Sequence, residues 1–130
     1  MKFETEQELF NHIVAHAASM DGPAVDGYND NQCVYRSPAG NKCLVGACIS
    51  DGEYGSWMEG LLVGDLISQF PELIPYYDIL GSCQGAHDSL AKLYLAHQDK
   101  NRFSAELLEK LRTVAKEFNL DFVLPNEGDK

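Results

Sequence analysis

Apolar residues recur at helical spacing in four stretches of this 130-residue chain, and this periodicity decides most of what it can form. The first stretch opens with a Thr-x-x-Glu capping box, in which Thr5 is the predicted N-cap and Glu8 reaches back to it. One face of the helix that follows is apolar, and its members are Leu9, Phe10, Ile13, Val14 and Ala17. We therefore predict an amphipathic helix at the start of the chain.

Three further helices are expected. A short one covers residues 63–70 and ends at Pro71, whose ring clashes with the preceding turn. A longer one runs from residue 77 or 78 to residue 96, and Gly81 and Gly85 within it predict close packing against another element. The last begins at residues 103–104 with Ser104 as N-cap and extends to residue 118.

The middle of the chain has the signals of turns and strands. Residues 20–32 are rich in Gly, Pro, Asn and Asp and predict a loop. Two apolar runs, residues 33–36 and 42–49, flank a turn signal at 37–41 and predict a β-hairpin, although the second run could instead begin a helix. A turn centred on Pro38 would place Cys33 opposite Cys43. Residues 122–125 predict an edge strand or a docked tail, and residues 126–130 are expected to fray.

These elements predict the α+β class, with about four helices packed on a small antiparallel β-hairpin around a single core. No internal repeat or linker is visible, so residues 1–130 are expected to form one domain. The longest apolar run falls short of the roughly 18 residues that a membrane span needs. The first residues show no hydrophobic leader, which predicts a soluble, cytoplasmic protein.

The charge of the chain is acidic and unevenly distributed. Ten basic and twenty acidic residues give a net charge of −10. From Lys92 onward seven basic and seven acidic residues cancel, so the whole excess lies before residue 92. Such a surface repels phosphate backbones and predicts no direct binding of nucleic acid, while it could attract basic partners. Acidity could equally serve only to keep the protein in solution.

Arg36 and Lys42 are two of the three basic residues in the acidic part of the chain. On a hairpin they could bind a carboxylate or a phosphate, with the guanidinium group as a bidentate donor. Alternatively they neutralise neighbouring acidic residues and brace the turn. His12 and His16 are four residues apart on the first helix, but the pattern favours surface histidines over a metal clamp.

The cysteines and His87 allow two further interpretations. Cys33, Cys43, Cys83 and His87 could form a structural Cys3His zinc site, although their spacing lacks the usual short pairs. Cys43 or Cys83 could be a nucleophile with His87 as base, and a distant acid such as Glu59 or Asp65 would then orient the imidazole. The simpler alternative is a buried His87 next to an exposed Asp88. No nucleotide-binding or hydrolase motif is present, so no cofactor is expected.

Three segments together resemble a known group of proteins. They are Cys33-Val34-Tyr35-Arg36-Ser37-Pro38-Ala39-Gly40-Asn41-Lys42-Cys43-Leu44-Val45-Gly46, Met58-Glu59-Gly60 and Gln84-Gly85-Ala86-His87-Asp88. The pattern resembles a family of small proteins of tailed bacteriophages and prophages that has no assigned activity. The resemblance covers residues 3–93. It implies an accessory protein that acts in the host cytoplasm against host factors, including defence systems.

The leading hypothesis is therefore a non-enzymatic phage protein that binds and inhibits a host protein or sequesters a small anionic signalling ligand, without contacting a membrane. The acidic residues of the 20–32 loop would form the rim of the binding surface. A small enzyme that depends on cysteine and histidine or on a metal, and a structural zinc module, are the alternatives. The expected contact residues are Tyr35, Arg36, Lys42, Glu59, His87 and Asp88.

Overall fold

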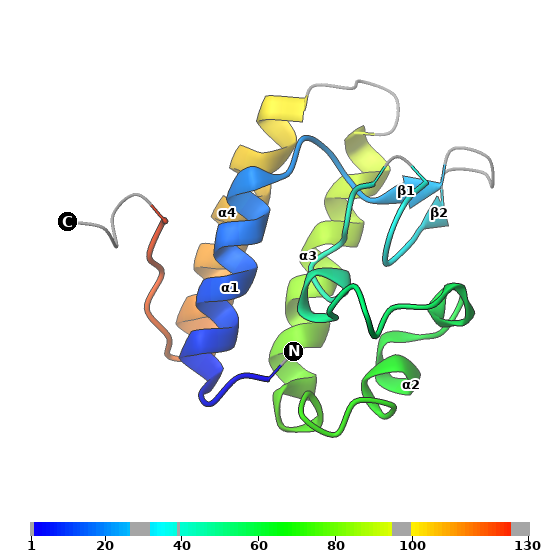
Figure 1. The fold of residues 1–130 in the computed structure, drawn as a ribbon. Helices are drawn as coiled ribbons and strands as arrows, with labels where there is room; N and C mark the ends of the chain where they lie inside the picture. Colours follow the sequence, from blue (N-terminus) through cyan, green and yellow to red (C-terminus); the bar gives the residue numbers. More distant parts are fainter. Residues whose placement is uncertain (1, 27–31, 39, 95–99, 126–130) are drawn as a thin grey trace.

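The computed structural model of the chain describes residues 2–26, 32–38, 40–94 and 100–125 (Figure 1). Within these residues the α-helices are α1 (Glu6–Ser19), α2 (Val63–Ile67), α3 (Tyr77–Tyr94) and α4 (Lys100–Glu117). Three short 3-10 helices lie between α1 and α3, namely η1 (Gly46–Cys48), η2 (Ser56–Met58) and η3 (Ile74–Tyr76). The helix α4 packs against both α1 and α3, and η1 lies against α1.

The predicted α+β class is wrong, because the described part of the chain is helical and lacks the expected hairpin. Its strands are limited to β1 (Val25–Asp26) and β2 (Gln32–Cys33), an antiparallel pair of two residues each. The run 42–49 instead turns into η1. Every residue from Cys43 to Ile49 is buried. A strand of a two-stranded hairpin buries alternate residues on one face, so a continuous buried run favours a compact turn inside the core.

The two arms of the predicted hairpin meet only in an isolated bridge between Arg36 and Lys42. The carbonyl of Tyr35 accepts the N–H of Cys43 at 3.1 Å, and the N–H of Ser37 donates to the carbonyl of Asn41 at 2.8 Å. These pairs centre the turn one residue after Pro38. Tyr35 rather than Cys33 therefore faces Cys43, and the predicted pairing of the two thiols is wrong.

The first helix matches its prediction closely. The hydroxyl oxygen of Thr5 accepts the N–H of Glu8 at 3.1 Å, and all five residues of the predicted apolar face are buried. In α3, Ile79, Leu80, Cys83 and Leu90 are buried, whereas Leu93 is exposed. Gly81 and Gly85 face open space, with no described atom within 4 Å of a Cβ added there, so the predicted close packing is absent. The predicted end of this helix at residue 96 lies outside the described residues.

The helix α4 begins at Lys100 rather than at the predicted residues 103–104. Ser104 is therefore not an N-cap, and its hydroxyl donates to the carbonyl of Ala17 at 2.8 Å, which ties α4 to α1. The tail beyond α4 docks on α1, because Gln7 exchanges hydrogen bonds with the backbone of Asp121 at 2.8 and 2.9 Å. The fraying predicted for residues 126–130 falls outside the described residues.

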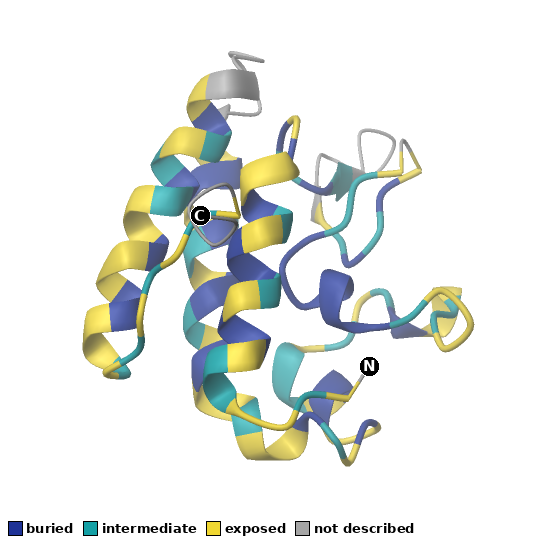
Figure 2. Cartoon of the chain, turned by 60° about the vertical axis from the view of Figure 1, so that its left-hand side comes forward, coloured by how far each residue is buried: buried dark blue, intermediate teal, exposed yellow. Residues whose placement is uncertain are grey.

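The buried apolar side chains form one cluster that α1, α3, α4 and the 43–49 segment share (Figure 2). Tyr76 ties the start of α3 to the N-terminal segment, because its hydroxyl donates to the carbonyl of Phe3 at 2.9 Å. No helix among the described residues is long and apolar enough to cross a membrane. Of the predicted contact residues, Tyr35, Arg36, Lys42 and Glu59 belong to the 33–62 segment, and His87 and Asp88 belong to α3.

Candidate functional site

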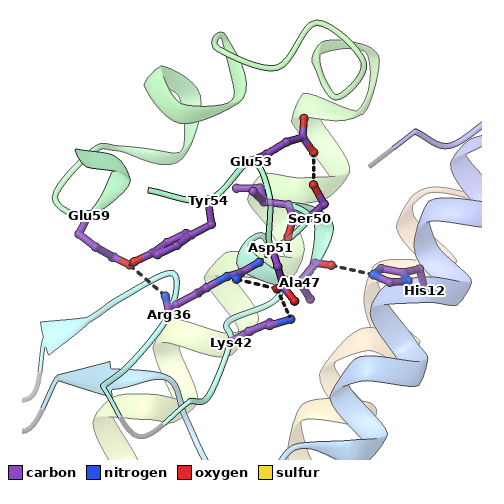
Figure 3. A network of polar contacts seen from close by, with 10 residues as sticks. His12, Arg36, Lys42, Ala47, Ser50, Asp51, Glu53, Tyr54 and Glu59 are labelled. Carbon is purple, nitrogen blue, oxygen red and sulfur yellow. Dashed lines mark hydrogen bonds and ion pairs between the residues drawn. The ribbon is translucent and has the colours of Figure 1, made fainter. Parts of the chain in front are cut away.

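Glu59 holds the segment that enters the turn. Its Oε1 accepts the backbone N–H of Tyr35 at 2.9 Å, and its Oε2 accepts the backbone N–H of Arg36 at 3.0 Å. The hydroxyl of Tyr54 donates to the same Oε2 at 2.6 Å (Figure 3). Burial and the bond to this carboxylate raise the pKa of Tyr54 to about 12. None of these three donor groups carries a charge.

Asp51 binds both basic groups of the predicted patch. The guanidinium of Arg36 donates from Nη1 to Asp51 Oδ1 at 2.7 Å, and the ammonium of Lys42 lies 3.3 Å from the same oxygen (Figure 3). Nη2 of Arg36 donates to the carbonyl of Ile49 at 2.6 Å, and the guanidinium stacks 4.6 Å from the centre of the Tyr54 ring. Hydrogen bonds from Lys42 and Arg36 hold the pKa of Asp51 below its usual value. The two cations therefore brace the turn.

The two histidines of α1 attach the helix to the buried 42–48 segment. Nε2 of His12 donates to the carbonyl of Ala47 at 2.8 Å (Figure 3), and Nε2 of His16 donates to the carbonyl of Lys42 at 2.7 Å. Burial lowers the pKa of His16, with the bond to Lys42 acting against this shift. These side chains bind backbone carbonyls rather than solvent, so the interpretation as surface histidines is corrected.

His87 is completely buried on α3 and connects two segments. The backbone N–H of Ala24 donates to its Nε2 at 3.1 Å, so Nε2 carries a lone pair. The proton of the neutral ring is then on Nδ1, which donates to Asp88 Oδ1 at 2.8 Å. The ring also packs edge-on against Phe103, with the centroids 5.8 Å apart. A fully buried side chain with both nitrogens engaged cannot be the surface contact that was predicted.

Asp88 accepts hydrogen bonds from three uncharged side chains. Besides His87, the amide of Gln84 donates to Oδ1 at 2.9 Å, and the thiol of Cys33 donates as well. Burial acts to raise the pKa of Asp88, but these hydrogen bonds and the electrostatic effect of His87 outweigh it and hold the pKa below its usual value. The Oε1 of Gln84 accepts the N–H of Val45 at 3.1 Å, so the same side chain also anchors the 43–49 segment.

Cys33, His87 and Asp88 bring three potential ligand atoms within 4.8 Å of one another, the one such group among the described residues. A metal on Nδ1 would move the ring proton to Nε2, and a metal-binding histidine normally donates its other N–H to an acceptor. Here Nε2 faces the N–H of Ala24, which is a donor. The hydrogen-bond pattern thus disfavours a metal. Cys43, which the predicted Cys3His site requires, is not in this group, and neither is Cys83.

The thiols are not arranged as nucleophiles. Burial raises the pKa of Cys43 and of Cys83 far above the ordinary thiol value near 9. Burial, with the charge of Asp88 and the hydrogen bond to it, raises the pKa of Cys33 to about 11. Reactive cysteines have lowered pKa values and basic neighbours. The geometry therefore supports neither of the predicted cysteine nucleophiles, Cys43 and Cys83.

A cavity of about 370 Å³ lies between β2, the 59–63 segment and α3. Its polar wall contains Glu59, Gln84 and Asp88, and its apolar wall is formed by the side chains of Leu61, Leu62 and Val63 together with residues 33–35. The side chain of Asp88 is 40% exposed and Leu62 is 76% exposed, so the cavity reaches the surface. None of the described residues that line it is basic.

The structure places the six predicted contact residues in three different settings. Tyr35, Glu59 and Asp88 line the cavity, whereas Arg36 and Lys42 meet at Asp51. His87 lies behind the cavity wall and positions Asp88. Sequence reasoning did not single out three residues of this region as contacts, namely Asp51, Leu62 and Gln84. The one available signal was the position of Gln84 on the same predicted helix as Asp88, one turn before it.

Comparison of the chain with protein-family models, with curated proteins and with solved structures found no match. The resemblance to the phage family therefore stays a prediction that rests on the motif alone. The site is defined by its own geometry: a surface cavity with two carboxylates, an amide and an apolar wall.

Proposed function

We propose that the protein is a binding module that captures a guanidinium or ammonium group of a partner in the cavity and thereby blocks that partner. One observation carries the proposal. Two carboxylates, Glu59 and Asp88, line a cavity whose described lining contains no basic residue. Ligand sites are typically clefts of roughly 300–1,000 Å³ with an apolar wall and a few convergent polar groups, and this cavity of about 370 Å³ fits that range.

Both carboxylates keep their charge available for a ligand. Each accepts three hydrogen bonds, and every donor is an uncharged amide, hydroxyl, thiol or neutral imidazole. A carboxylate offers about four acceptor positions, so each can receive a further donor. A cation that enters the cavity would meet two negative charges held in place in advance, which favours binding.

The surroundings add to this negative potential. From residue 43 to residue 91 the sequence contains seven acidic residues and no Lys or Arg. The charges of Glu59, Asp88 and Asp65 contribute, after burial and Cys43, to the raised pKa of the Tyr35 phenol in the cavity wall. Lys92 follows Asp88 by one helical turn, but it is exposed and is not a lining residue.

A small anionic ligand has less support than a cationic one. The anion was expected to bind Arg36 and Lys42, and both are held by Asp51. Releasing them would cost two ion pairs and would detach the guanidinium from the Ile49 carbonyl. The further step to a phage protein that inhibits a host factor rests on the motif resemblance and remains a hypothesis.

The proposal is tested by titrating the protein with N-acetylarginine methylamide and following backbone amide shifts by NMR. We expect saturable shifts at Cys33, Tyr35 and Asp88, and an affinity that falls as salt concentration rises. Asp88→Asn should weaken binding by about tenfold, because it removes one of the two charges. Asp121→Asn is the matched control, since this exposed carboxylate lies beyond α4 and outside the cavity lining.

Acetate and phosphate serve as probes of the opposite charge in the same titration. Shifts at Arg36 and Lys42 with these anions, and none with the arginine derivative, would overturn the proposal. It would also fail if Asp121→Asn weakened binding of the arginine derivative as much as Asp88→Asn does.

A further inference from the structure

The cavity is continuous with an exposed apolar surface. Six large apolar side chains are exposed among the described residues, and four of them belong to the segment from residue 57 to residue 77. These four are Trp57, Leu62, Ile74 and Tyr77, with exposed fractions of 50–76%. Single exposed apolar residues are ordinary on a protein surface. Leu62, however, is also a lining residue of the cavity.

Two of these side chains are joined by the short helix α2. Leu62 is the N-cap of α2 and also lines the cavity. Tyr77 lies over Gly64 of the same helix, where an added Cβ would come within 3.1 Å of the Tyr77 ring. The absence of a side chain at Gly64 lets the ring lie close to the backbone. Leu62, Gly64 and Tyr77 thus form an apolar strip, which leads from the cavity to Tyr77 at the start of α3.

The charges next to this strip are negative. Asp65 on α2 and Asp78 on α3 are both exposed, and each directly follows a residue of the strip in the sequence. With Asp88 and Glu59 in the cavity, the whole surface combines carboxylates with apolar side chains. A complementary partner combines basic and apolar side chains, and an amphipathic helix presents both within one or two turns.

We propose that the occupant of this surface is a basic amphipathic segment of a partner protein. One of its Arg or Lys side chains enters the cavity, and apolar side chains three or four residues away pack on Leu62 and Tyr77. This inference rests on the proposed function, because the cavity must first accept a cation. A free amine would fill the cavity and leave the strip exposed.

The test compares two synthetic helical peptides by isothermal titration calorimetry. Both have one central Arg in an Ala-rich and Lys-containing sequence, and they differ only in having Leu or Ser three and four residues after the Arg. We expect the Leu peptide to bind about tenfold more tightly, because burial of apolar surface contributes only in that peptide. Leu62→Ser should remove most of this difference. Its side chain is 76% exposed, so the fold should tolerate the change.

Leu93→Ser provides the matched control, since Leu93 is an exposed leucine of α3 outside the strip. It should leave the preference for the Leu peptide unchanged. Equal affinities of the two peptides would overturn the inference while leaving the cavity proposal intact, and so would an equal loss in Leu62→Ser and Leu93→Ser. If neither peptide nor the arginine derivative binds, the proposed function itself fails.

Discussion

Single carboxylates hold the polar side of this protein together. Glu59 accepts two consecutive backbone N–H groups, from Tyr35 and Arg36, and the hydroxyl of Tyr54. Asp51 gathers Arg36 and Lys42. These acceptors do for an irregular segment what a neighbouring strand does in a sheet, because they satisfy backbone and side-chain donors that would otherwise be unpaired.

Glu59→Gln should lower the free energy of unfolding by about 1–3 kcal/mol, because one end of the amide is a donor and would face the N–H of Tyr35 or Arg36. Urea unfolding followed by circular dichroism measures the loss. Glu109→Gln is the control, since it affects only an exposed i,i+3 ion pair with Arg112 and should cost less than about 1 kcal/mol. Equal losses in the two variants would show that Glu59 has no special role.

Cys33 should react slowly with alkylating reagents although it is exposed. Its pKa of about 11 leaves roughly 100-fold less thiolate near pH 8 than an ordinary thiol of pKa 9 has. Asp88→Asn removes a charge that raises this pKa and should therefore speed alkylation. Mass spectrometry after timed iodoacetamide treatment reports the rate at each cysteine. A rate for Cys33 equal to that of a free thiol, or unchanged in Asp88→Asn, would contradict the assignment.

Sequence patterns drew attention to three residues that share one cavity, but they could not identify the partners of the others. Tyr35, Glu59 and Asp88 were singled out and meet at one cavity. Arg36 and Lys42 were also singled out. Their partner Asp51 lies fifteen residues after Arg36 and nine after Lys42, in a turn whose path the motif does not determine. A side chain's type shows that it needs a partner, whereas the partner's identity depends on the tertiary fold.

At the scale of elements, apolar periodicity predicted where the helices lie, whereas the strand signals predicted a hairpin that the described residues do not form. The apolar face of α1 is buried as expected, because a 14-residue amphipathic helix removes its apolar side chains from water by packing that single face on the core. The run Cys43–Ile49 is apolar throughout and has no period, so propensity alone could not distinguish a strand from a buried turn. Tertiary contacts determine the conformation of this run. The side-chain oxygen of Gln84 accepts the N–H of Val45, and the carbonyl of Tyr35 accepts the N–H of Cys43.

Gly46 is the residue that allows this buried turn. A Cβ at this position would lie 2.2 Å from the backbone oxygen of Tyr35. Gly46→Ala must therefore displace the 33–36 segment, and we expect a loss of about 3 kcal/mol or more in stability. Gly52→Ala is the matched control, because a Cβ there meets open space. Thermal unfolding of both variants measures the difference. A nearly unchanged melting temperature for Gly46→Ala would mean that the close approach to Tyr35 is absent.

The net charge of the molecule lies in the part of the sequence that forms the cavity, α1 and most of α3. The neutral part of the sequence supplies α4, which packs against α1 and α3, while the acidic part supplies the cavity and the strip. The core beneath contains three buried thiols, Cys43, Cys48 and Cys83. Burial raises the pKa of each, to about 12 for Cys48 and further for the other two. These raised pKa values make the free energy of unfolding of the whole protein vary with pH in the alkaline range.

The sign of that dependence follows from proton binding. In the unfolded chain these thiols lose their protons near pH 9, whereas in the native protein they keep them beyond pH 11. Between these limits the native state binds more protons, so stability is complete below pH 9 and falls as the pH rises. Each buried thiol contributes about 1.4 kcal/mol per pH unit to this slope. Cys33 and the phenols of Tyr35 and Tyr54, whose pKa values are also raised, add to it. Urea unfolding in the presence of a reductant between pH 7 and pH 11 measures the slope. The double variant Cys48→Ala with Cys83→Ala should be less stable at pH 7, but its slope should be smaller by about 3 kcal/mol per pH unit. An undiminished slope in that variant would refute the role of the buried thiols.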